Sequence, residues 1–243
     1  ELQKALYLAR NGRPGPVLLD IPMDIQRSQI DPERMESFSP RKNSISALDS
    51  VGSKDFTAHE IKDLILQSRR PVIIAGGGVR ISDACHELLA FVDKTKIPVV
   101  TSLMGLDAIP HDNRSFWGMI GSYGNRYSNF ALANSDLLII LGSRLDTRQT
   151  GTQPSTFARS ARKIHVDIDP AELNEKIKVD LALQKDIRDF LMQMNAVFST
   201  EETPDLSKWY DYFDSLKYKF GKISPVRPGK NIDPNRFMEI LSS

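Results

Sequence analysis

A run of residues after a strongly apolar segment carries side chains suited to hold an anion. Residues 137–141 are all aliphatic, and Gly142 follows, with Arg144, Asp146 and Arg148 close behind. Ligands of an open α/β sheet bind at the carboxyl ends of its strands, and arginine binds phosphate or carboxylate through a planar pair of donors. The pattern predicts an anion-binding crevice; the alternative is a surface ion pair between Arg144 and Asp146.

The elements that would position this crevice alternate between strand and helix. Predicted strands are short aliphatic runs at residues 16–21, 71–75, 97–101, 137–141, 163–168 and 178–181. Predicted helices cover residues 2–9, 57–68, 82–94, 127–134, 186–198 and 235–241, and residues 104–125 are expected to be irregular. This alternation predicts an α/β fold: a doubly wound, mostly parallel six-stranded sheet with helices on both faces, of Rossmann-like type.

The overall composition excludes several classes of function. Thirty-two basic and 31 acidic residues give a net charge of +1, so nucleic acid is not an expected partner. No apolar run approaches the roughly 18 residues of a membrane span, and the amino end has no leader pattern, so a cytoplasmic protein is expected. Cys85 lies in an apolar helical pattern and is expected to be a core thiol. The four histidines lack metal-ligand spacing, so no metal site is expected in this chain.

Six short motifs occur in order along the chain, at residues 12–22, 76–78, 104–105, 118–121, 136–148 and 165–172. Together they resemble thiamine diphosphate-dependent enzymes of the acetolactate synthase type. The first motif resembles the last strand of the family's pyrimidine-binding domain, and the others resemble its central domain. Each motif is weak by itself, but their shared order over residues 1–195 makes the resemblance specific.

The resemblance implies a division of the chain. Residues 1–39 would end the pyrimidine-binding domain, 40–56 would be a linker, 57–198 the central domain, 199–232 a second linker, and 233–243 the start of the pyrophosphate-binding domain. In the family, a catalytic glutamate lies in the first domain, and a Gly-Asp-Gly motif in the third holds magnesium and the diphosphate. Thiamine diphosphate and Mg²⁺ would therefore bind outside this chain, which has no assigned catalytic residue and is expected to be inactive alone.

The resemblance also implies a crevice in the central domain, which holds FAD in acetolactate synthases, ADP in some relatives, and nothing in many decarboxylases. Arg148 matches a family arginine that faces the carboxylate of the second keto acid. Asp167 and Ile168 would lie at the adenine end and Asp186 near the ribose. The implied cofactor-binding positions are Gly76, Gly77, Gly78, Ser102, Leu103, Met104, Gly142, Arg144, Arg148, Asp167, Ile168 and Asp186.

Four of these positions have simpler alternatives. The glycines at 76–78 would also suit a tight turn between a strand and a helix. Asp167 would also suit a hydrogen bond to nearby backbone.

Three segments depart from the family pattern. Acetolactate synthases usually have Arg-Phe-Asp-Asp-Arg-Val at residues 144–149, where Thr147 here replaces an acid. They also usually have Gly-Met-His-Gly at residues 121–124, and Gly-Asp where this chain has Lys185-Asp186. The departures favour a divergent relative with another 2-keto acid or an aldehyde acceptor.

The implied function is decarboxylation of a 2-keto acid and carboligation. The parent would be a homo-oligomer, a dimer or tetramer, whose central domain supplies the nucleotide crevice and a subunit scaffold. One alternative is a 2-keto acid decarboxylase with an empty central crevice. Others are a non-catalytic nucleotide-binding module and a domain that serves only as a scaffold.

Overall fold

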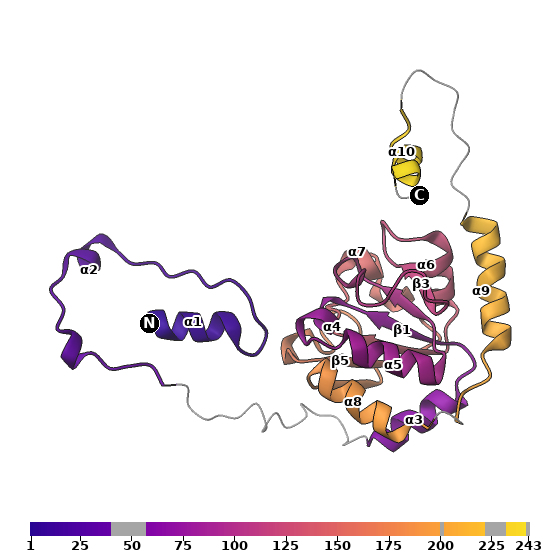
Figure 1. Ribbon diagram of the computed structural model, residues 1–243, viewed down its shortest axis with the longest axis horizontal. Helices are drawn as coiled ribbons and strands as arrows, with labels where there is room; N and C mark the ends of the chain where they lie inside the picture. The colour runs from indigo at the N-terminus through magenta and orange to yellow at the C-terminus, as the bar shows by residue number, and fades with distance from the viewer. Residues whose placement is uncertain (40–56, 200–201, 222–231, 242–243) are drawn as a thin grey trace.

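The computed structural model describes residues 1–39, 57–199, 202–221 and 232–241 (Figure 1). Its central sheet has the order β3-β2-β1-β4-β5-β6, and all neighbouring strands are parallel. The strands are β1 (Pro71–Ala75), β2 (Val99–Thr101), β3 (Phe116–Met119), β4 (Leu137–Leu141), β5 (Arg162–Asp167) and β6 (Leu181–Gln184). The predicted doubly wound, six-stranded α/β sheet is confirmed.

The helices connect the strands and flank the sheet. They are α1 (Leu2–Arg10), α2 (Met23–Arg27), α3 (Ala58–Gln67), α4 (Gly77–Ile81), α5 (Cys85–Thr95), α6 (Arg126–Ala133), α7 (Thr147–Thr150), α8 (Ile187–Val197), α9 (Ser207–Phe220) and α10 (Pro234–Leu241). α5 links β1 to β2, and α6 links β3 back to β4 in the opposite direction, so right-handed crossovers place them on opposite faces. α3 and α5 pack against α8, and α6 packs against α9.

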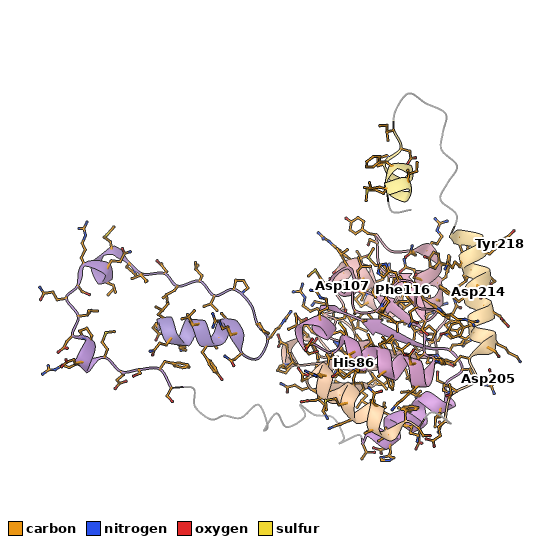
Figure 2. All side chains as sticks on the ribbon, viewed as in Figure 1. His86, Asp107, Phe116, Asp205, Asp214 and Tyr218 are labelled. Atoms are coloured by element: carbon orange, nitrogen blue, oxygen red, sulfur yellow. The ribbon has the colours of Figure 1, made fainter. Side chains whose placement is uncertain are left out.

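Residues 1–39 extend away from the sheet, with their side chains largely in solvent (Figure 2). The predicted strand at residues 16–21 is wrong: this run forms no strand, and Leu18 is 93% exposed. A strand requires a hydrogen-bonded neighbour, and no described residue supplies one for this run. The predicted linker at residues 40–56 lies outside the described residues. So do parts of the later predicted segments, at residues 200–201, 222–231 and 242–243.

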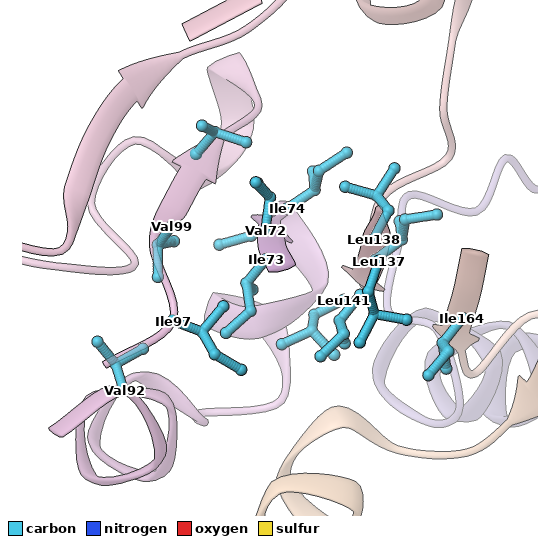
Figure 3. Close-up of a cluster of buried hydrophobic side chains, with 14 of the residues drawn as sticks. Val72, Ile73, Ile74, Val92, Ile97, Val99, Leu137, Leu138, Leu141 and Ile164 are labelled. Carbon is cyan, nitrogen blue, oxygen red and sulfur yellow. The ribbon is translucent and has the colours of Figure 1, made fainter. Parts of the chain in front are cut away.

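The core lies between the sheet and its helices (Figure 3). Every residue of β1 and β4 is buried, as expected for central strands covered on both faces. α9 extends this core with aromatic side chains. Trp117 of β3 stacks on Phe213 at 3.8 Å between ring centroids, and the indole N–H of Trp209 donates to the carbonyl of Pro71 at 3.1 Å.

Several local predictions are confirmed, and others are displaced. Thr57 and Glu60 form the reciprocal capping box that begins α3. β3 lies in the segment expected to be irregular, and β6 begins where the last predicted strand was expected to end. Both are edge strands with one neighbour and shorter buried runs, so their sequences carry a weaker pattern. Cys85 is only partly buried and lines an apolar groove beside His86 and Asp107, so the expectation of a core thiol is wrong.

In the described part of the chain, none of the helices combines the length and the apolar character needed to cross a bilayer.

Candidate functional site

A cleft of about 560 Å³ lies beyond the carboxyl ends of β1 and β4. These two strands are neighbours at the centre of the sheet, where the chain order changes direction, and such a switch point is where open α/β sheets bind ligands. Nine of the twelve predicted cofactor-binding residues line the cleft: Gly77, Gly78, Ser102, Met104, Gly142, Arg144, Asp167, Ile168 and Asp186.

The remaining three predicted residues lie outside the cleft lining. Gly76 follows β1 and donates its N–H to the carbonyl of Leu141 at 2.8 Å. Leu103 lies in a 3-10 turn (Leu103–Gly105) and is exposed. Arg148 has an exposed side chain on α7, and its carbonyl accepts from the N–H of Ser122 at 2.7 Å. The expected contact of Arg148 with a substrate carboxylate stays a prediction.

The glycines hold two turns in close contact. Gly142 follows β4 with φ of +56°, and a Cβ added at Gly78 would lie 2.6 Å from the Cα of Gly142. The N–H of Gly78 donates to the carbonyl of Gly142 at 2.9 Å. Only glycine tolerates this approach, so the tight-turn alternative accounts for Gly78 and Gly142, although both also line the cleft.

Buried residues hold the turn that carries Arg144. Leu145 is buried and has φ of +50°, which is unusual for a residue with a side chain. The carbonyl of Ser143 accepts from Nε2 of His165 at 2.9 Å, which fixes the Nε2–H tautomer and leaves Nδ1 without a described partner. His165 is 1% exposed, and burial lowers its pKa to about 4, so the ring is neutral near pH 7.

The Arg144 guanidinium is exposed and makes no ion pair with any described residue. The alternative pairing with Asp146 does not form. Asp146 instead caps α7 by accepting from the N–H groups of Arg148 and Gln149. Gln149, which departs from the family pattern, accepts from the hydroxyl of Ser143 at 2.7 Å and closes the turn. Arg144 therefore presents free donors at the cleft.

Carboxylates form another part of the cleft. Asp167 accepts the N–H of Asp169 through Oδ1 at 3.0 Å, which fits the local-backbone alternative, and burial raises its pKa. Asp186 caps α8 by accepting the N–H of Arg188 through Oδ1 at 2.8 Å. In each case the second carboxylate oxygen has no hydrogen bond within the described chain. Each is therefore an available acceptor for a ligand hydroxyl or amine.

The amino-terminal wall of the cleft was not predicted. Arg10, Gly12, Arg13 and Pro14 line it, although the motif at residues 12–22 was matched only to the last strand of the pyrimidine-binding domain. Nη1 of Arg13 donates to Asp169 at 2.8 Å and to Glu172 at 3.2 Å. The Arg13 guanidinium holds the pKa of Asp169 below its usual range. The arginine within a Gly-Arg-Pro-Gly turn was the available signal, but its partners lie 156 and 159 positions away.

The donor set of this cleft fits an adenine nucleotide carrying a diphosphate. Its volume is within the usual range of about 300–1,000 Å³ for small-molecule sites. Guanidinium groups suit phosphate oxygens, and the Asp167 and Asp186 carboxylates suit ribose hydroxyls or an adenine amine. The described residues contain no group of three or more His, Cys, Asp or Glu that could hold a metal ion.

Comparison with known proteins matches this architecture. The family model for the central domain of thiamine pyrophosphate enzymes matches residues 58–194. The chain is 39% identical over 246 residues to the acetolactate synthase large subunit of Corynebacterium glutamicum. This match covers 99% of this chain and 38% of that protein. It is 38% identical over 243 residues to acetolactate synthase 1, chloroplastic, of Zea mays, covering 99% and 37%.

A probable acetolactate synthase large subunit of Methanocaldococcus jannaschii is 38% identical over 246 residues, covering 98% of this chain and 40% of that protein. The chain thus spans about two fifths of the length of these curated relatives.

Proposed function

Because the chain belongs to the thiamine pyrophosphate enzyme central-domain family, we propose that it forms the central part of a larger acetolactate synthase-like enzyme. That parent decarboxylates a 2-keto acid and joins the remainder to an acceptor. This chain supplies a crevice for FAD or ADP and a scaffold for the subunits of a cytoplasmic dimer or tetramer. The cleft at the β1–β4 switch point, with free arginine donors and two carboxylates, carries the proposal.

Each part of the cleft has a binding role in this proposal. Arg144 donates to the diphosphate of the nucleotide, and Gly77 allows its backbone to approach the ligand closely. Asp186 accepts from the ribose hydroxyls, and Asp167 with Ile168 meets the adenine. In the parent, bound thiamine diphosphate supplies the carbanion chemistry, and this chain orients the nucleotide and the neighbouring segments.

The proposed domain division follows the same scheme. Residues 1–39 belong to a pyrimidine-binding domain, 57–198 to the central domain, and 233–243 to a pyrophosphate-binding domain, with linkers between them. The chain alone therefore neither binds thiamine diphosphate with Mg²⁺ nor turns over a 2-keto acid. Carbon dioxide release from a 2-keto acid by the purified chain, with both cofactors added, would contradict this part of the proposal.

The nucleotide is tested first by mass spectrometry of any small molecule released when the purified chain is denatured. Titration calorimetry with FAD and with ADP then measures affinity. Arg144→Gln is expected to weaken binding about tenfold or more, because a charge-assisted hydrogen bond contributes roughly 1.5–3 kcal/mol. Arg159→Gln is the matched control, since Arg159 is exposed and lies outside the cleft lining.

Failure of both nucleotides to bind, in this chain and in the full-length parent, would replace the proposal with the empty-crevice decarboxylase or the scaffold. Aldehyde release without carboligation by the parent distinguishes the decarboxylase. Unchanged activity of the parent after Arg144→Ala and Arg148→Ala would favour a scaffold. Tight nucleotide binding with no keto acid chemistry in the parent would favour the non-catalytic module.

A further inference from the structure

Two walls of the cleft come from distant parts of the chain, and each carries an arginine. One is the Arg144 turn (residues 142–145), which follows β4. The other is the arm segment (residues 10–14), which begins at the last residue of α1. Both line the same cleft, and neither has regular secondary structure across its cleft-lining residues 12–14 and 142–144. The relative position of the two arginines therefore depends on tertiary contacts.

Glu172 is linked to both walls, directly to the arm segment and through Lys176 to the Arg144 turn. Its side chain is 13% exposed, and Oε1 accepts from Nη1 of Arg13 in the arm segment at 3.2 Å. Oε2 accepts from Nζ of Lys176, four positions further along the chain, at 3.0 Å. Nζ of Lys176 also donates to the carbonyl of Arg144 at 3.3 Å. A continuous path of hydrogen bonds thus runs from the arm segment through Glu172 and Lys176 to the Arg144 turn.

We infer that Glu172 and Lys176 are a positioning pair that sets the two arginine-bearing walls relative to one another. The inference rests on the proposed nucleotide site, because it concerns how that site is held in a binding arrangement. The Arg144 guanidinium has no ion pair of its own in the described chain, so the placement of Arg144 depends on the contacts of its backbone. That backbone enters the left-handed region at Leu145 and is held by His165 at Ser143 and by Lys176 at Arg144.

The pair acts on the two walls unequally. Asp169 also binds Arg13, so the arm segment keeps one partner when Glu172 is removed. The Arg144 carbonyl, in contrast, accepts no other side-chain donor in the described chain than Lys176. Loss of Lys176 therefore disturbs the turn alone, loss of Glu172 disturbs both walls, and Asp169→Asn disturbs the arm segment alone.

The test uses the full chain, with ADP as the probe and the side-chain NMR signals of ¹⁵N-labelled arginine as a second readout. Lys176→Met and Glu172→Met are expected to shift the Arg144 signal and to weaken ADP binding by about three- to ten-fold, the range of partly exposed ion pairs and hydrogen bonds. Lys176→Arg restores a donor at the same place and is expected to restore both readouts.

Lys178→Met is the matched control. Lys178 lies two positions further along the same loop and also donates to a backbone carbonyl, that of Asn174, which is outside the cleft. It is expected to change neither the Arg144 signal nor the ADP affinity. Asp169→Asn is expected to move the Arg13 signal and to leave that of Arg144 in place.

The outcomes separate this inference from the proposed function. If the unmodified chain does not bind ADP but Lys176→Met and Glu172→Met still shift the Arg144 signal, ADP is excluded as the nucleotide and the positioning role stands. If the chain binds ADP and neither variant moves the Arg144 signal or the affinity, the positioning role is overturned. Equal effects of Lys176→Met and Lys178→Met would overturn it as well.

Discussion

Two segments of this chain begin with the same two residues, but only one of them forms a strand. Residues 16–21 and β1 both start with Pro-Val and continue with aliphatic side chains. β1 lies in the middle of the sheet, whereas residues 16–21 form no strand (Figure 1). All residues of β1 are buried, and residues 16–21 are exposed. Their local sequences are too alike to explain the difference.

Neighbours explain it. Ile73 of β1 pairs with Val99 on one side and Ile139 on the other, so its backbone is hydrogen-bonded and both faces of the strand are covered. Residues 16–21 have no such partner within the described chain. An aliphatic run thus indicates a strong tendency toward a buried strand, and the surrounding chain decides whether that tendency is realised.

The sharpest test of this comparison replaces one aliphatic side chain in each segment with alanine. Ile73→Ala is expected to lower the free energy of unfolding by about 3 kcal/mol, since it leaves a cavity in a fully buried site. Leu18→Ala is expected to change it by less than about 0.5 kcal/mol. Urea denaturation measures both changes in the free energy of unfolding, because the fluorescence of Trp117 and Trp209, which lie in the sheet region, follows unfolding. Equal losses would show that residues 16–21 are buried in solution.

A second test uses pH, because burial in the sheet also affects a titrating side chain. Burial lowers the pKa of His165 from 6.5 to about 4, so the unfolded chain binds a proton more readily than the folded one. Stability is therefore unaffected by His165 above pH 6.5, and about 3 kcal/mol is lost as the pH falls from 6.5 to about 4. In urea titrations at several pH values, His165→Gln is expected to flatten this slope.

His86→Gln is the control for that experiment, because His86 is exposed on α5. Its pH profile is expected to follow that of the unmodified chain. A profile of His165→Gln that also coincides with the unmodified chain would mean that His165 is not buried as a neutral ring.

The parts of the fold that were predictable are those whose residues are buried on both faces. Residues 71–75 and 137–141 correspond to β1 and β4, because central parallel strands are continuous aliphatic runs. Residues 163–168 correspond to β5, in which aliphatic residues alternate with Lys163, His165 and Asp167. β3 was missed because Gly118 interrupts a short edge strand between Trp117 and Met119. β6 was displaced because only Leu181 of its four residues is buried.

The candidate site was predictable to the same degree. The rule that ligands bind at the carboxyl ends of parallel strands predicted the place of the cleft, and Gly142 and Arg144, which line it, were predicted from the strand that precedes them. The arm segment was not found, because Arg13 meets Asp169 through an ion pair between positions far apart in the sequence. Likewise, the support of the Arg144 turn by His165 and Lys176 depends on tertiary contacts that no local pattern encodes.

A smaller difference in the free energy of unfolding is expected between an acidic residue of the sheet region and one of residues 16–21. Asp136 precedes β4 and accepts from the N–H groups of Arg69 and Arg70 at 3.0 and 2.9 Å, as well as from the hydroxyl of Ser68. Asp136→Ala leaves these donors without their acceptor and is expected to cost about 2 kcal/mol in urea denaturation. Asp20→Ala, in the exposed run, is expected to cost less than about 0.5 kcal/mol. Similar costs for both would refute the comparison.

The smallest effect is expected where the two regions meet. Arg13→Ala removes ion pairs whose side chains are partly exposed, so the urea midpoint of the sheet region is expected to stay unchanged. Trypsin cleavage after Arg10 is expected to become about two- to five-fold faster, because cleavage follows the population of the detached arm segment. Arg34→Ala, whose ion pair with Asp31 lies within residues 1–39, is the control. An unchanged cleavage rate in Arg13→Ala would mean that Arg13 does not hold the arm segment against the cleft.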